Sequence, residues 1–169
     1  MQLISWNVRG LNEPTKHCML KQKILQDKPT VIFTQETKCT NDSIYSLMSR
    51  IWKGIQVMEI DNNGATRGIT IAWNPSLLAL NIFASTSHSL YASFHILDTN
   101  ITWHLMNVYG PQAPTLKKKL LDHISWFSSQ HPDPLLILGG ISIRSPHSRK
   151  KRGLSNPIPW RYPLQILYW

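Results

Sequence analysis

Polar side chains lie at the ends of three apolar segments of this chain, at positions where chemistry could take place. The first segment, residues 2–11, carries the amide of Asn7 and the guanidinium of Arg9 near its end. Two later segments end in the carboxylate of Glu36 and the phenol of Tyr109. α/β folds place their chemistry at such strand ends, because the buried half fixes the backbone while the tip reaches solvent. These four side chains are therefore the candidates for a functional site.

The segments between these tips predict the elements that would hold them. Helical spacing over residues 16–27 between two strand patterns indicates a βαβ-like unit, and a second helix is expected to begin near Asp42. We expect the first helix to face inward through four apolar residues: Met19, Leu20, Ile24 and Leu25. A strand–helix–strand unit of this kind predicts two parallel strands at the start of the fold.

From Gly54 onward the hydrophobic period becomes two, which predicts antiparallel ribbons. The patterns at 88–97 and 101–109 indicate a hairpin, and a helix is expected from Pro114, followed by a short buried strand at 135–138. The residues of this helix expected to face inward are Leu116, Leu120, Leu121, Ile124 and Phe127. βαβ-like units combined with ribbons predict two sheets packed face to face with helices outside.

Composition indicates a globular chain, and the charge is concentrated at one end. The net charge is +9, but residues 141–169 hold six of the basic residues and no acid, which leaves 12 basic and 9 acidic residues before them. No apolar run approaches the roughly 20 residues of a membrane span and no leader pattern is present, so we expect an intracellular protein. Cys18 and Cys39 lack metal-ligand spacing and are expected to be free thiols.

Four motifs in order resemble the endonuclease/exonuclease/phosphatase superfamily. They lie at residues 4–11, 35–38, 107–111 and 138–140, and read ISWNVRGL, QETK, NVYGP and LGG. Within that superfamily the chain resembles the N-terminal endonuclease domain of plant LINE-type (non-LTR) retrotransposons over about its first 140 residues. An ordered set of four motifs is far more specific than any one of them.

The resemblance implies a four-layered α/β sandwich that cleaves DNA with Mg²⁺ or Mn²⁺, where the metal polarises the phosphate. By motif position Glu36 would be the metal ligand, Asn7 would bind the metal-site network or the phosphate, and Tyr109 would place its hydroxyl near the phosphate. Arg9 receives only a weaker role, as a phosphate contact. Taken singly, Glu36 could be a solvated carboxylate, Asn7 a turn former and Tyr109 a half-buried aromatic.

The chain departs from the family at its next motif. Where relatives carry Gly-Asp-Phe-Asn, residues 141–143 read Ile-Ser-Ile, and the later acidic and histidine motifs are missing. Loss of one general base alone costs about 10²- to 10⁴-fold in rate, so no turnover is expected. We therefore divide the chain into 1–140, the N-terminal portion of such a domain with an incomplete sandwich, and 141–169, a basic, Pro-rich and irregular tail. A frameshift after Gly140 would explain the tail, and the coding DNA in the alternate frame tests it.

Two alternatives remain open at this stage. The chain could be a residual Mg²⁺-dependent endonuclease in which Asp133 or His147 replaces the missing base. It could instead be a non-catalytic nucleic-acid-binding module acting through the run Arg149–Arg152, which also resembles a nuclear import signal. DNA is the expected partner, and neither a membrane nor an obligate protein partner is indicated.

Overall fold

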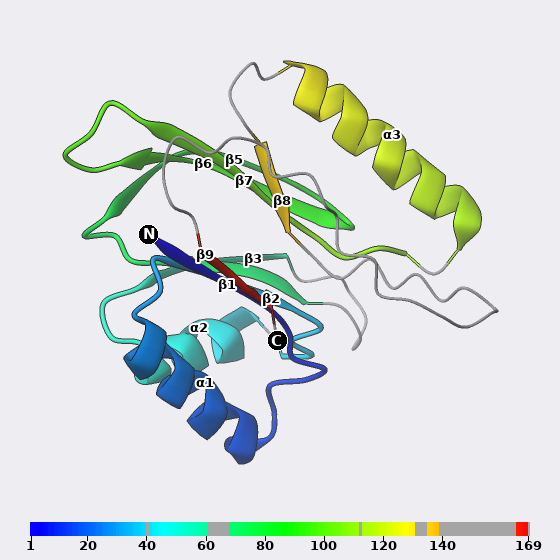
Figure 1. The fold of residues 1–169 in the computed structure, drawn as a ribbon. Helices are drawn as coiled ribbons and strands as arrows, with labels where there is room; N and C mark the ends of the chain where they lie inside the picture. Colours follow the sequence, from blue (N-terminus) through cyan, green and yellow to red (C-terminus); the bar gives the residue numbers. More distant parts are fainter. Residues whose placement is uncertain (40, 61–67, 112, 131–134, 139–164, 169) are drawn as a thin grey trace.

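The computed structural model describes residues 1–39, 41–60, 68–111, 113–130, 135–138 and 165–168. Two β-sheets pack face to face, and helices cover the outer face of each sheet (Figure 1). The four-layered α/β sandwich predicted from the resemblance is therefore confirmed.

The first sheet has the strand order β3-β4-β2-β1-β9. Strands β1 (Gln2–Asn7) and β2 (Val31–Gln35) are parallel neighbours joined by α1 (Pro14–Asp27), which confirms the predicted βαβ unit. β4 (Ile69–Trp73) then pairs antiparallel with β2, and β3 (Gln56–Ile60) pairs antiparallel with β4. The carboxyl ends of β1 and β2 consequently lie at the same edge of the sheet.

The second sheet has the order β5-β6-β7-β8. β5 (Leu78–Thr86), β6 (Ser89–Ile96) and β7 (Thr102–Val108) form an antiparallel meander, which includes the predicted hairpin of β6 and β7. α3 (Pro114–Gln130) then returns the chain so that β8 (Leu135–Leu138) pairs in parallel with β7. Each sheet therefore contains one pair of parallel strands joined by a helix, β1–α1–β2 in the first and β7–α3–β8 in the second.

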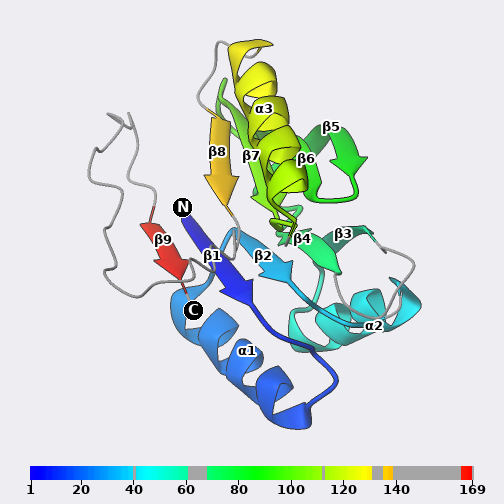
Figure 2. The ribbon, with the colours of Figure 1, turned by 90° about the vertical axis from the view of Figure 1, so that its right-hand side faces the viewer.

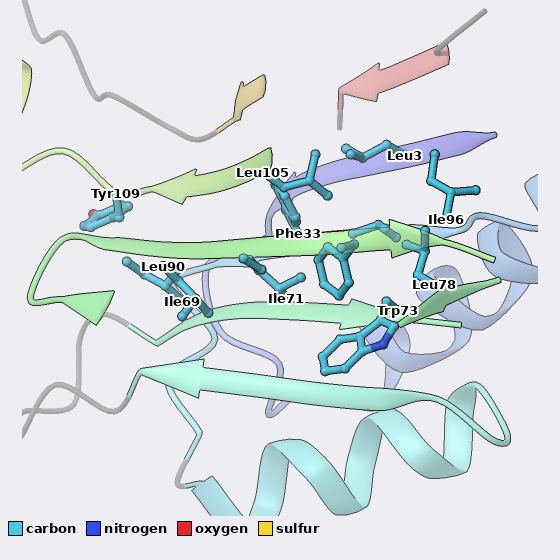
Figure 3. Packing of buried hydrophobic residues seen from close by; sticks show 13 residues of the cluster. Leu3, Phe33, Ile69, Ile71, Trp73, Leu78, Leu90, Ile96, Leu105 and Tyr109 are labelled. Carbon is cyan, nitrogen blue, oxygen red and sulfur yellow. The ribbon is translucent and has the colours of Figure 1, made fainter. Parts of the chain in front are cut away.

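Side chains of the first sheet alternate between its two faces, so the sheet contributes to two hydrophobic cores. Leu3 and Phe33 face the second sheet, whereas Ile4 and Ile32 face the helices, because successive side chains of a strand point to opposite faces. The core between the sheets contains residues from both (Figure 3): Leu3, Phe33, Ile71, Trp73, Leu78, Leu90, Phe94, Ile96 and Leu105. The outer core lies under α1 and α2 (Asn41–Ile51), so the first sheet is buried on both faces.

Helices α1 and α3 each contact their sheet through a narrower stripe than their sequence spacing predicts. α1 buries Leu20 and Ile24, and α3 buries Leu120 and Ile124, with Phe127 packed beside them. The other apolar residues predicted to face inward are exposed to a large extent: Met19 (39%), Leu25 (66%), Leu116 (41%) and Leu121 (51%). Met19, Leu25 and Leu121 each adjoin a buried residue in the sequence and so lie about 100° around the helix from it, which turns them off the sheet. Leu116 lies in the first turn of α3.

The expectation of an irregular tail is wrong for four residues. Gln165–Tyr168 form β9, which pairs in parallel with the outer edge of β1 (Figure 2). An edge strand offers unpaired backbone amides and carbonyls, and a short apolar segment can satisfy them. Residues 141–164 and Trp169 lie outside the described residues. Across the described part of the chain, no helix combines the length and the apolar character that crossing a bilayer requires.

Candidate active site

The ends of β1 and β2 continue as two turns that run side by side. The ladder extends beyond the strands, because the amide of Val8 donates to the carbonyl of Gln35 (3.0 Å). It goes on with the amide of Gly10 donating to the carbonyl of Glu36 (2.6 Å) and that of Leu11 to the carbonyl of Thr37 (2.8 Å). These bonds fix the backbone from which the candidate side chains project.

Three of the sequence-predicted residues meet at the carboxylate of Glu36. Its Oε1 atom accepts a hydrogen bond from Asn7 Nδ2 (3.0 Å) and another from Tyr109 Oη (2.8 Å). Tyr109 is 8% exposed at one end of the core between the sheets, and Glu36 is half-buried. Tyr109 thus bonds a carboxylate that lies 73 positions earlier in the chain.

The orientation of this cluster is set by its surroundings. Asn7 Oδ1 accepts a hydrogen bond from the amide of Arg9 (3.2 Å), so both ends of the Asn7 side chain have a partner. Glu36 has a φ of 57°, in the left-handed region that a residue with a side chain enters at a cost of about 1–2 kcal/mol. Such backbone strain concentrates at functional sites, where the surrounding structure holds it in place.

A buried amide network, made of Ser5, Gln35 and Asn107, joins the two sheets beneath this cluster. Gln35 Nε2 donates to Asn107 Oδ1 (2.7 Å) and to Ser5 Oγ (3.4 Å). Asn107 Nδ2 donates to the carbonyls of Thr34 (3.1 Å) and Thr70 (2.9 Å). The three side chains are at most 5% exposed, so these bonds are shielded from water.

The network explains why the cluster assembles, and sequence reasoning assigned it no role. Gln35 directly precedes Glu36, and Asn107 precedes Tyr109 by two positions, so one cross-sheet contact fixes the spacing of both site residues. The available signal was a polar residue inside each apolar strand just before the tip. Buried polar groups need hydrogen-bond partners, which makes such residues candidates for pairing with one another.

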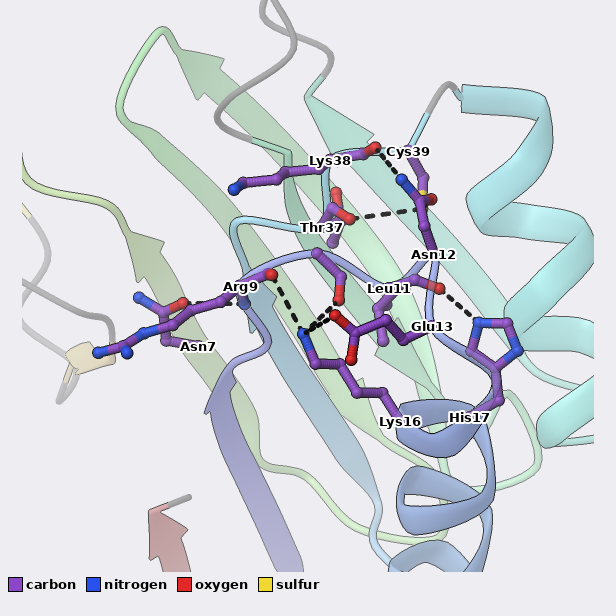
Figure 4. Close-up of polar contacts among 11 residues, drawn as sticks. Asn7, Arg9, Leu11, Asn12, Glu13, Lys16, His17, Thr37, Lys38 and Cys39 are labelled. Carbon is purple, nitrogen blue, oxygen red and sulfur yellow. Dashed lines mark hydrogen bonds and ion pairs between the residues drawn. The ribbon is translucent and has the colours of Figure 1, made fainter.

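The side chain of Arg9 makes no hydrogen bond with the Glu36 cluster among the described residues. Its guanidinium is exposed and makes no ion pair within the described residues, and Figure 4 shows it extending away from α1. Cys18 is exposed and Cys39 is half-buried, and neither forms a disulfide, as expected. The residues considered as substitutes for a missing base, Asp133 and His147, lie outside the described residues, as do the run 149–152 and positions 141–143.

The donor set at Glu36 is compatible with a magnesium ion. Glu36 Oε2 has no hydrogen-bond partner in the part of the chain that the structure describes, so it offers a hard oxygen ligand. No group of three or more His, Cys, Asp or Glu side chains is gathered at one point among these residues. Mg²⁺ keeps several waters and binds through one or two carboxylates together with substrate phosphates, so a single carboxylate fits that ion.

Solved structures with the same fold were found, whereas no protein-family model and no curated protein sequence matches the chain. One is an endonuclease/exonuclease/phosphatase family protein from Bacteroides thetaiotaomicron, with a TM-score of 0.64 and 10% identity over 81% of this chain and 60% of that one. A second is D. rerio TDP2 complexed with a single-strand DNA product, with a TM-score of 0.62 and 18% identity over 80% and 58%.

A third similar structure is an AP endonuclease from Archaeoglobus fulgidus, with a TM-score of 0.60 and 18% identity over 80% of this chain and 55% of that one. At these identities the likeness shows the fold. The chain spans about three fifths of the length of the structures it resembles. Its architecture is therefore that of this group of structures, whose members include nucleases.

Proposed function

We propose that this chain is the N-terminal portion of a retrotransposon-derived DNA endonuclease domain that retains half of a metal-dependent phosphodiesterase site and does not turn over. The observation that carries the proposal is the convergence of Asn7 and Tyr109 on the carboxylate of Glu36. The order of the four motifs supports the LINE-type origin. DNA as the partner is supported by similar structures whose names include an AP endonuclease and a complex with single-strand DNA.

Each residue of the cluster has a distinct role in this proposal. Glu36 would hold the ion through Oε2, while the two hydrogen bonds to Oε1 keep the carboxylate from rotating. Asn7 and Tyr109 are donors that can bond a phosphate oxygen in place of Oε1. A bound Mg²⁺ or Mn²⁺ ion would supply Lewis acidity to polarise the phosphate and stabilise the leaving oxygen.

The missing half of the site is the reason to propose inactivity. Relatives place an aspartate that orients water and an asparagine that binds phosphate where this chain has Ile141 and Ile143. An isoleucine side chain neither accepts a proton nor donates a hydrogen bond. In this proposal the cluster would bind a metal ion and a phosphate, while positions 141 and 143 would supply no general base to activate water.

Two measurements on purified protein test the proposal. Plasmid nicking in Mg²⁺ should not exceed background, and Mn²⁺ binding by calorimetry should weaken at least tenfold in Glu36→Gln, because Oε2 loses its charge. Asp122→Asn, an exposed carboxylate on α3, is the matched control and should bind Mn²⁺ as the wild type does. Nicking by the wild type that disappears in Glu36→Gln would overturn the inactive assignment. Equal Mn²⁺ binding by both variants would overturn the assignment of Glu36.

A further inference from the structure

Two exposed cations lie on the turns that follow β1 and β2, and each comes two positions after a residue of the Glu36 cluster. Arg9 lies on the first turn with a φ of 47°, and Lys38 lies on the second with a φ of 54°. Figure 4 shows both side chains extending to the side away from α1. Because a left-handed backbone costs energy for a residue with a side chain, glycine would be the simplest choice at each position. The chain instead places a positive charge at both.

Other groups brace these two turns, so the cations are not needed to hold them. Lys16 Nζ donates to the carbonyls of Arg9 (3.1 Å) and Gly10 (3.0 Å), and Asn12 Nδ2 donates to the carbonyl of Lys38 (3.3 Å). Only backbone atoms of Arg9 and Lys38 take part in these bonds. Within the described residues neither charged group has an acidic partner. The fold therefore positions both cations and leaves them open to a ligand.

The stem of Lys38 is held close to the first turn. A Cβ atom added at Gly10 would lie 3.5 Å from Lys38 Cδ, so the aliphatic chain of Lys38 passes over Gly10. Gly10 has a φ of 95°, which only glycine adopts without strain, and its position fixes how closely the two turns approach. The two cations are consequently carried on adjacent backbones and belong to one surface, the cation pair Arg9 and Lys38.

We infer that the cation pair binds phosphodiester groups of a DNA strand next to the phosphate held at Glu36, and so sets the path of the strand across the site. A strand that approaches the Glu36 carboxylate meets like charge, and cations beside it offset that repulsion. A guanidinium can bond a phosphate through two N–H groups, whereas an ammonium acts as a point charge. Lys38 thereby receives a binding role that its motif alone does not assign, and Arg9 acts together with it.

The inference rests on the proposed function, but its test requires neither metal nor turnover. We would measure binding of a short DNA duplex in EDTA at several salt concentrations for the wild type and for Arg9→Asn with Lys38→Asn, because asparagine tolerates a left-handed backbone. Each phosphate contact contributes about 0.9 to the slope of log affinity against log salt, so the slope should fall by about 1.8. Between about 50 and 150 mM salt the wild type should lose roughly sevenfold more affinity than the variant.

Matched variants separate this site from general charge. Lys118→Gln with Lys119→Gln removes the same charge from the exposed face of α3 and should leave the slope unchanged. Arg9→Lys with Lys38→Arg keeps the charges and should keep the slope. An unchanged slope in the asparagine variant, or an equal fall in the α3 control, would overturn the inference. Glu36→Gln should bind metal more weakly but keep the wild-type salt slope of DNA binding, since that slope is measured without metal. The metal assignment and the cation-pair inference can therefore fail independently.

A measurement on the unaltered chain covers the case in which the variants fail to fold. The duplex should protect Lys38 from amine acylation, read by mass spectrometry, while Lys118 and Lys119 stay reactive. Inorganic phosphate at the same ionic strength should not protect Lys38, because a single anion cannot bridge the two turns as a strand does. Equal protection by phosphate would show a site for isolated anions, and absence of protection by the duplex would exclude contact. Either result would overturn the inference.

Discussion

Replacing Asn107 with leucine should destabilise the sandwich more than any other single change of similar size in β7. The substitution removes three hydrogen bonds and leaves Gln35 Nε2 and the carbonyls of Thr34 and Thr70 without this partner between the sheets. A buried polar group that loses its partner costs about 1–3 kcal/mol, so three of them give a loss of about 3–9 kcal/mol. A domain is usually stable by only about 5–15 kcal/mol, so this loss is a large share of the total.

Urea denaturation followed by circular dichroism measures this loss through the midpoint of unfolding. Met106→Leu is the control, since Met106 neighbours Asn107 but faces α3, and a swap that conserves volume costs less than about 1.5 kcal/mol. The double variant Gln35→Leu with Asn107→Leu should lose less unfolding free energy than the sum of the two single variants. The reason is that the Gln35 amide, which Asn107→Leu alone leaves without this partner, is then removed as well. Strict additivity, or a loss in Asn107→Leu no larger than in the control, would refute the role given to the network.

Two further changes test contacts around the site and in the core between the second sheet and α3. Gly68→Ala should lower stability by about 1–3 kcal/mol, because the added Cβ would clash with Thr37 Oγ1 and turn it from Glu59 Oε1. Thr37→Ala in the same chain should recover part of that loss in urea melts, and no recovery would contradict the clash. Burial raises the pKa of Tyr91, although a hydrogen bond with Ser93 opposes the shift. The unfolded phenol therefore ionises first near pH 10, and stability should fall above that pH. Tyr91→Phe should reduce this alkaline fall in urea midpoints, and an identical fall in both proteins would refute it.

Periodicity predicted the elements well, because each sheet imposes a spacing that the chain shows locally. The alternation of residues 56–60 and 69–73 marks strands whatever their partners are. The pairing of β9 with β1 was not predictable in this way, since a strand edge accepts many apolar segments and about 160 positions separate the partners. The helix faces were overestimated because spacing identifies an apolar stripe but not how much of it a sheet covers.

The candidate site shows the same division between local and distant information. Motif order identified Asn7, Glu36 and Tyr109, but the contact of Gln35 with Asn107 depends on how two sheets pack, across 72 positions. That packing also explains how the cluster at Glu36 keeps its shape. The Glu36 carboxylate is held by two neutral donors to one oxygen, and both donors come from the strands and turns that the structure describes. On the proposed function, replacing the later motif would therefore remove the activation of water and leave the phosphate-facing cluster in place.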